Sequence, residues 1–341
     1  MQKEPIASFA AANGYTGFRS YYEQILHNDT FSHVYVLKGG PGTGKSTLMK
    51  TLAKRYRDRG IHTESILCSS DPDSLDGVVL TSDREKIAIL DGTAPHQQDA
   101  RLPGSQDTLI DLACKLDERM LKEARQELSA LQMKKALAYK KGYEFLSLCG
   151  IINDKIEAEC ETEDGISSVY GELTHALETS KRGGVCTRLY NAFSKDGRIA
   201  LPHESNASQR ILLDGNPYVT KHLMQSLVRT VNEHHYDATV VPDALDANRY
   251  LSVEIPSIGL LITTEAVECP TRTFYFKRPT FDAEEEMRLF YNGLLARSAE
   301  RLSEAFGYHK QMETIYSQAI DFSAVSECRE RIAREIDDRL S

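Results

Sequence analysis

The 341-residue sequence predicts an α/β protein built from two parallel-sheet domains in tandem, each completed by a helical hairpin. Three observations lead to this prediction. An apolar run at 34–37 is followed by a glycine-rich loop and then by a helical pattern. Strand and helix patterns continue to alternate as far as residue 91, which is typical of a parallel sheet covered by helices. The series then recurs, in weaker form, in the second half of the chain.

The glycine-rich segment 39–46 has the spacing G-x-x-x-x-G-K-[ST], which is typical of a phosphate-binding loop, or P-loop. Glycines allow positive φ, so main-chain N–H groups can turn toward phosphate oxygens at the start of the following helix. Lys45 is expected to contact the β- and γ-phosphates, and the Ser46 hydroxyl to bind Mg²⁺. Both domains are therefore predicted to be P-loop NTPase-like in fold. The predicted nucleotide-binding residues are Gly39, Gly40, Pro41, Gly42, Thr43, Gly44, Lys45, Ser46 and Thr47.

A second element of a phosphate site is predicted where the apolar run 87–90 ends in Asp91. An acidic residue at the end of a neighbouring strand holds Mg²⁺ in P-loop NTPases. Lys45 and Asp91 are therefore the predicted catalytic residues, and Ser46 and Asp91 the predicted metal ligands. The alternative is an aspartate that ends a strand at a turn, since Gly92 follows it.

Thr93 and His96 follow Asp91 closely and are candidates for sensing the γ-phosphate, orienting water or binding a substrate. The alternative is that Pro95 and His96 only shape the loop. Many ATP-hydrolysing P-loop proteins have a glutamate directly after the aspartate, as the base that activates water. This chain has Gly92 there, so slow switching and transfer to another acceptor are both compatible with the sequence.

The first domain is predicted to cover residues 1–183. Apolar and aromatic residues from Phe18 to Leu26 recur at helical spacing and predict a short amphipathic helix. The βαβ series predicts ligand binding at the carboxyl ends of its strands. Its predicted elements are a strand at 34–38, a helix at 44–59 and strands at 62–68 and 86–91. A helical pattern at 107–160 predicts a hairpin that turns near Met133.

The second domain, residues 184–341, is predicted to be a duplicate of the first. Lys45 falls on Lys221 when the two halves are superimposed, and Pro72–Asp76 falls on Pro242–Asp246. Each match is weak, but their shared order indicates duplication. The predicted strands lie near 210–214, 237–241, 258–263 and 272–277. They are followed by a helical pair at 282–338, with a turn placed at Gly307.

The second copy is predicted to have lost its phosphate loop. Gly42, Gly44 and Ser46 become Tyr218, Thr220 and His222, whose side chains would fill the space for phosphate.

The metal-binding aspartate is also missing from the second copy, because Asp91 becomes Thr263. We therefore expect one working nucleotide site, and a second half retained for shape. Lys221 is expected to be solvated. The repeated Pro-Asp-x-Leu-Asp is interpreted as a structural turn, while Asp71 keeps a possible functional role.

Composition restricts the class of partner. The net charge of −9 argues against a chain that coats nucleic acid or an anionic membrane. Seven scattered cysteines without a C-x-x-C pair indicate reduced thiols, and therefore a cytoplasmic protein without disulfides or a zinc site. No apolar signal segment or membrane-length apolar stretch is present. We expect neither a membrane nor a nucleic-acid partner.

The glycine loop, the stretch Asp91-Gly92-Thr93-Ala94-Pro95-His96 and the two-copy layout resemble a family of uncharacterised tandem P-loop ATPases. These are common in spore-forming Gram-positive bacteria and are sometimes labelled nucleotide kinases. The resemblance covers nearly the whole chain and implies ATP and Mg²⁺ as ligands, but no substrate. The second copy often keeps a P-loop in that family, from which Tyr218, Thr220 and His222 depart.

The leading hypothesis for function is a Mg²⁺-dependent, ATP-binding P-loop NTPase, an ATPase with one active site in the N-terminal half. A second is a small-molecule or nucleotide kinase, motivated by the missing glutamate, although nothing resembles an acceptor-binding lid. A third is a nucleotide-gated, non-enzymatic scaffold whose helical hairpins bind a protein partner or substrate. The base of the nucleotide is not readable, because P-loops grip phosphates.

Overall fold

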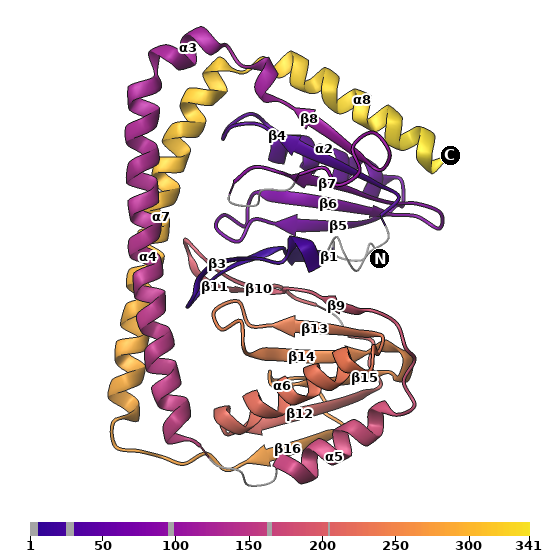
Figure 1. Cartoon of the computed structure of the whole chain (residues 1–341), viewed down its shortest axis with the longest axis vertical. Helices are drawn as coiled ribbons and strands as arrows, with labels where there is room; N and C mark the ends of the chain where they lie inside the picture. The colour runs from indigo at the N-terminus through magenta and orange to yellow at the C-terminus, as the bar shows by residue number, and fades with distance from the viewer. Residues whose placement is uncertain (1–5, 25–30, 95–98, 162–165, 204) are drawn as a thin grey trace.

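The computed structural model describes residues 6–24, 31–94, 99–161, 166–203 and 205–341 (Figure 1). It has two α/β halves, each with a mixed sheet, beside a pair of long helices. The first half contributes β1 (Ile6–Phe9), β2 (Ala11–Gly14), β3 (Gly17–Ser20), β4 (His33–Lys38), α2 (Lys45–Asp58), β5 (His62–Leu67), β6 (Leu75–Thr81), β7 (Lys86–Asp91), β8 (Asp107–Asp111), η1 (Ala113–Lys115), α3 (Glu118–Glu123) and α4 (Arg125–Glu159).

The second half repeats the order of the strands. It contributes α5 (Ile166–Leu177), β9 (Val185–Thr187), β10 (Asn191–Ser194), β11 (Gly197–Ala200), β12 (Gln209–Gly215), α6 (Pro217–Glu233), β13 (Ala238–Pro242), β14 (Tyr250–Ile255), η2 (Pro256–Ile258), β15 (Leu260–Thr263), β16 (Arg272–Phe276), α7 (Glu284–Ala319) and α8 (Phe322–Leu340).

The two six-stranded sheets have the same topology. The strand order is β1-β5-β6-β7-β4-β8 in the first and β9-β13-β14-β15-β12-β16 in the second. The two-stranded hairpin β2–β3 of the first half has a counterpart in β10–β11. A repeat of every strand in the same order is strong support for the predicted duplication.

The sheets are mixed and not purely parallel, which corrects the sequence-based prediction. β6 runs antiparallel to both β5 and β7, while β4 lies parallel to β7 and β8. The links 68–74 and 82–85 are too short for a crossover connection, so consecutive strands must pair antiparallel. The sequence-based prediction did not include β6, and it placed the residues of β8 in a helical region.

The first sheet has a core on each face. On one face, α2 buries Leu48, Met49, Leu52 and Tyr56, which recur at helical spacing. On the other face, Val34, Val36, Ala88 and Leu90 pack against apolar residues from the N-terminal segment, including Tyr22 and Phe31. Strands β4 and β7 are therefore buried on both sides, and their carboxyl ends are held side by side in the sheet.

The N-terminal segment forms strands up to Ser20, so the amphipathic helix predicted from Phe18 to Leu26 does not begin at Phe18; among the described residues of that range, 22–24 are helical. Phe18 lies in β3, which forms a hairpin with β2 through a turn at Tyr15 and Thr16, and Gly17 after this turn has φ of 100°. The Tyr15 N–H donates to the Leu245 carbonyl at 2.8 Å, so this hairpin tip is anchored to the second half. Residues 25–30 lie outside the described residues.

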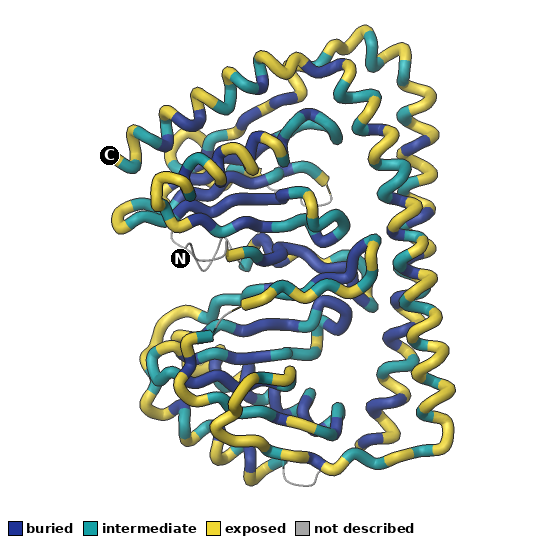
Figure 2. Tube along the Cα trace, turned by 180° about the vertical axis from the view of Figure 1, so that it is seen from behind, coloured by how far each residue is buried: buried dark blue, intermediate teal, exposed yellow. Residues whose placement is uncertain are grey.

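The predicted turns of the two helical hairpins are wrong, although two helices, α7 and α8, do cover the predicted pair at 282–338, with their break after Ala319. α4 runs without interruption from Arg125 to Glu159, through the turn expected near Met133, and α7 runs through Gly307. The two long helices instead pair with each other along one side of the molecule (Figures 1 and 2). Gly142 permits this approach, because an added Cβ would lie 3.3 Å from Leu302, and Ser298 Oγ donates to the Gly142 carbonyl at 3.0 Å.

The pairing is antiparallel, so each long helix carries the chain from one half to the other. As a result, the two halves exchange their last helices. α8 packs on the core of the first half through Val325, Ile332, Ala333 and Ile336. α5 packs on the core of the second half through Val169, Leu173 and Leu177. Neither compact unit is therefore a contiguous stretch of the chain.

Within the described part of the chain, every helix is too short or too polar to cross a lipid bilayer.

Candidate functional site

The glycine loop lies between the carboxyl end of β4 and the amino end of α2, as the sequence predicts. Gly42 has φ of 71° and Gly44 has φ of 85°, the left-handed conformation that side chains with a Cβ rarely adopt. Gly44 precedes the first turn of α2, and no side chain caps that turn. The free N–H groups of the turn and the helix dipole favour an anion at this position.

Lys45, the charged residue of the loop, is buried, with 8% of its surface exposed. Its Nζ donates to the carbonyls of Gly39 at 3.0 Å and Gly40 at 2.8 Å. Asp91 Oδ2 lies 3.8 Å from the same nitrogen. The register explains this proximity, because Asp91 stands opposite Leu37 on the adjacent strand. The structure therefore brings together the ammonium and carboxylate that the sequence singles out.

The other predicted polar residues are held locally. Ser46 Oγ accepts from the Leu75 N–H at 2.9 Å, and Thr43 Oγ1 donates to the Gly40 carbonyl at 2.9 Å. Asp91 Oδ1 accepts from both the N–H and the Oγ1 of Thr93, at 2.9 and 2.6 Å. Thr47, exposed on α2, completes the loop. His96 lies outside the described residues.

The donor set suits Mg²⁺ better than a metal bound entirely by protein. No group of three or more His, Cys, Asp or Glu side chains converges among the described residues. Mg²⁺ is usually held by one or two carboxylates together with substrate phosphates and water. Asp91 offers one carboxylate and Ser46 one hydroxyl oxygen, which are donor types of this kind.

The loop is also covered by the second half of the chain, which the sequence reading did not anticipate. An added Cβ at Gly42 would lie 2.5 Å from the carbonyl oxygen of Glu313 in α7. One at Gly40 would lie 2.8 Å from the ring of Tyr316. No sequence pattern could have shown this, because it depends on the pairing of α4 with α7. The site therefore combines elements from both halves.

Substituting Gly42 by alanine tests this contact. Gly104 has φ of 77° with no atom within 4 Å of its would-be Cβ, so Gly104→Ala isolates the conformational cost, about 1–2 kcal/mol. Gly42→Ala adds a clash with main-chain atoms of α7. We expect a larger loss of stability for Gly42→Ala in urea unfolding followed by circular dichroism. Equal losses for the two variants would contradict the contact.

Glu313 itself is paired on its own helix. Burial opposes ionisation, but hydrogen bonds from His309 and Lys310 outweigh it and lower the pKa of Glu313 to about 2. Lys310 Nζ lies 2.8 Å from the Glu313 carboxylate. The end of α7 therefore presents an ionised, partnered glutamate beside the glycine loop.

Asp71 lies near two lysines from the second half of the chain. Burial raises the pKa of its carboxyl, while the nearby Lys310 and Lys195 act in the opposite direction. Lys195 lies in the β10–β11 turn, so it too comes from the second half. Asp71 lies in the loop from β5 to β6, at the same place in this loop as Asp246 in the loop from β13 to β14.

The structural equivalence corrects two of the sequence alignments. Pro72–Asp76 leads into β6, whereas Pro242 ends β13, so the two Pro-Asp-x-Leu-Asp segments are not equivalent. The register pairs Leu37 with Asp91 and Leu212 with Thr263. Since Leu213 is the counterpart of Leu37, the counterpart of Asp91 is Thr264, not Thr263. The conclusion that threonine replaces the aspartate is unchanged.

The second copy has no glycine loop in its structure. The residues aligned with 41–44 form the first turn of α6, which starts at Pro217. Asn216 caps this turn by accepting from the N–H groups of Tyr218 and Val219 at 3.0 and 3.3 Å. The main-chain donors that would bind phosphate are thus already used. One extra helical turn therefore replaces the loop.

Lys221 is not solvated, contrary to the sequence-based expectation. Its Nζ lies 2.8 Å from both Glu157 and Asp246, and its side chain is 11% exposed. Burial alone would lower the pKa of Lys221, but the hydrogen bonds to Asp246 and Glu157 outweigh this effect and raise it. The counterpart of the loop lysine has become part of a buried ion-pair cluster.

Comparison with known proteins gives one result. Residues 18–79 match the family described as Nephrocystin 3, N-terminal. The matched stretch runs from β3 to β6 and contains the glycine loop and α2. No curated protein and no solved structure gives a significant match to the chain. The match leaves the second copy uncovered, so the likeness to tandem P-loop ATPases stays a prediction.

Proposed function

We propose that this protein is a Mg²⁺-dependent, ATP-binding P-loop NTPase with a single nucleotide site in its first half. The single observation that supports this most is the position of Lys45, buried inside the glycine loop and 3.8 Å from Asp91. In this proposal the loop amides and Lys45 bind the triphosphate, and Ser46 and Asp91 bind the metal ion. The metal ion would neutralise charge on the phosphates.

The loss of the loop from the second half supports one site over two. There the equivalent N–H groups are capped by Asn216, and the equivalent lysine is neutralised by Glu157 and Asp246. The tandem ATPase family suggested by the sequence fits this proposal, with the difference that one copy has become inactive toward nucleotide.

Turnover of ATP and GTP, each with and without Mg²⁺, tests the proposed activity. We expect Mg²⁺-dependent release of inorganic phosphate from at least one of the two nucleotides without an added acceptor. Turnover that appears only when a second substrate is supplied would favour phosphoryl transfer. Failure to bind either nucleotide at millimolar concentrations in the presence of Mg²⁺ would refute the proposal.

Asp91→Asn is expected to remove the dependence of nucleotide binding on Mg²⁺ and to slow turnover at least about tenfold, since a charged contact contributes about 1.5–3 kcal/mol. Asp99→Asn is the matched control, because Asp99 lies in the same loop but is exposed and pairs with Lys38. Titration of Mg²⁺ at fixed ATP, read by calorimetry, compares the two variants. Identical titrations for Asp91→Asn and wild type would remove Asp91 from the metal site.

A further inference from the structure

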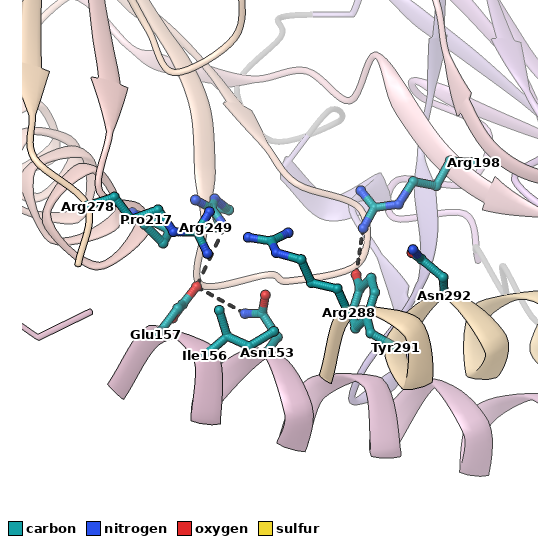
Figure 3. A pocket seen from close by; sticks show the side chains of 10 residues that line it. All are labelled: Asn153, Ile156, Glu157, Arg198, Pro217, Arg249, Arg278, Arg288, Tyr291 and Asn292. Carbon is teal, nitrogen blue, oxygen red and sulfur yellow. Dashed lines mark hydrogen bonds and ion pairs between the residues drawn. The ribbon is translucent and has the colours of Figure 1, made fainter. Parts of the chain in front are cut away.

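A cavity of about 300 Å³ lies in the second half, where the end of α4, the start of α7 and the amino end of α6 meet (Figure 3). Its place in the second half corresponds to that of the glycine loop in the first, because Pro217 at the start of α6 is one of its lining residues. The volume is at the lower end of the range for small-molecule sites.

Four arginines line this cavity, and they come from four separate segments. Arg198 belongs to β11 and Arg249 precedes β14, while Arg278 follows β16 and Arg288 belongs to α7. Glu157 is the one carboxylate among the lining residues. Since the chain as a whole has a net charge of −9, such convergence of cations is not a result of composition.

The carboxylates nearby neutralise the cluster only in part. Glu157 is shared between Lys221 at 2.8 Å and Arg249 at 3.6 Å. Glu284, outside the lining, is shared between Arg278 and Arg288. Each of these glutamates therefore serves two cations, while Arg198 donates to a neutral partner, the Tyr291 hydroxyl, at 2.6 Å.

The guanidinium groups also have N–H donors that the hydrogen bonds described here do not use. Each carries five N–H donors in a planar fork that matches carboxylate or phosphate oxygens. Arg198, Arg278 and Arg288 use one each in hydrogen bonds to Tyr291 and Glu284. The Nε of Arg278 is buried without a hydrogen-bond partner among the described residues. A buried donor of this kind is costly unless something accepts from it.

We propose that this cavity binds a small anion that carries phosphate groups, held by Arg198, Arg249, Arg278 and Arg288. A multiply charged oxyanion would accept from several guanidinium forks at once and would relieve the repulsion among them. The amino end of α6, a helix of 17 residues, adds its positive dipole end from one side. In this proposal, arginine side chains in the second half bind an anion where main-chain amides of the glycine loop do so in the first half.

This proposal goes beyond the nucleotide site and does not depend on it. It also changes the expectation that the second half is retained for shape alone. A ligand there would contact both long helices, through Asn153 and Arg288, and α7 runs from this cavity to the glycine loop. The cavity is therefore placed to influence the first half, although its ligand binding is tested on its own.

The test uses the full chain carrying Lys45→Met, so that the glycine loop contributes little to binding. Pyrophosphate is the probe, and isothermal calorimetry is the measurement. We expect saturable binding, weakened at least about tenfold by Arg288→Gln and by Arg249→Gln, since each removes charged hydrogen bonds. Arg229→Gln is the matched control, because Arg229 is exposed on α6 outside the cavity, and it should bind as the parent does.

Arg288→Lys is a further variant at this position that keeps the positive charge. It serves as a control for loss of binding through misfolding. It is expected to weaken binding less than Arg288→Gln, because the ammonium keeps the attraction but loses the planar fork. Absence of pyrophosphate binding at millimolar concentrations would overturn the proposal. Pyrophosphate binding of unchanged affinity in Arg288→Gln, Arg249→Gln and Arg288→Lys would also overturn it. Tighter binding of citrate than of pyrophosphate would overturn the assignment to phosphate.

Discussion

Replacing Lys45 by methionine is expected to raise the dissociation constant for Mg²⁺-ATP by about 10- to 100-fold, because one charged contact to the phosphates is lost. Methionine keeps the apolar stem and removes only the ammonium. The loss of stability should be small. Asp91 keeps the two hydrogen bonds from Thr93, and the side chain of Asp91 remains 15% exposed.

Lys221→Met is the matched control for binding, since it makes the same chemical change at the equivalent position of the second copy. Isothermal calorimetry with Mg²⁺-ATP measures both variants. Lys221→Met should bind ATP as wild type does. If Lys45→Met bound ATP normally, or if Lys221→Met lost binding to the same extent, the single-site proposal would be wrong.

Lys221→Met is expected instead to destabilise the second half by about 3 kcal/mol, because removing one partner of a buried ion pair leaves an uncompensated charge. Glu157 and Asp246 are 9% and 12% exposed, so water screens them poorly. Arg249, at 3.6 Å from Glu157, offsets part of the loss. Urea unfolding followed by far-ultraviolet circular dichroism measures the effect, since the chain has no tryptophan.

A triple variant identifies the cause of that loss. Adding Glu157→Gln and Asp246→Asn to Lys221→Met removes the two unpaired charges and should restore much of the stability. Loss of stability that persists in the triple variant would point to packing and not to charge. A single Lys221→Met variant as stable as wild type would contradict the ion-pair cluster itself.

The two equivalent lysines, Lys45 and Lys221, have different surroundings in the two halves. In the first half the ammonium lies among loop carbonyls with one carboxylate nearby, and we propose that it binds phosphate there. In the second half α4 contributes Glu157 and the loop after β13 contributes Asp246, and together they hold the ammonium. Both positions carry lysine, and the difference between them comes from the neighbouring residues.

Local elements could be predicted from the sequence because their signals are local. The predicted strand at 34–38 and helix at 44–59 correspond to β4 and α2. The glycine spacing predicted the positive φ at Gly42 and Gly44. The apolar run that ends at Asp91 predicted a strand there, and the adjacent register brings Asp91 to Lys45.

The long helices show where the sequence signal ends. The apolar pattern from 107 to 160 does not indicate which helix packs against it. The pattern fits a local hairpin within this segment as well as pairing with the distant helix α7. Two copies of one unit carry the same apolar faces, so either partner satisfies the pattern. The pairing of α4 with α7 and the exchange of α5 and α8 follow from antiparallel packing across the whole molecule.

By itself the sequence determined the glycine loop with its lysine and aspartate, and it predicted a two-copy layout in which the second copy lacks the loop. Each of these depends on residues close in the chain, or on two segments that resemble each other. Only the tertiary structure decided that α7 covers the glycine loop, that Lys221 is buried among carboxylates, and that four arginines meet in one cavity. These features join residues far apart in the chain, and their contacts exist only once the two halves have packed together.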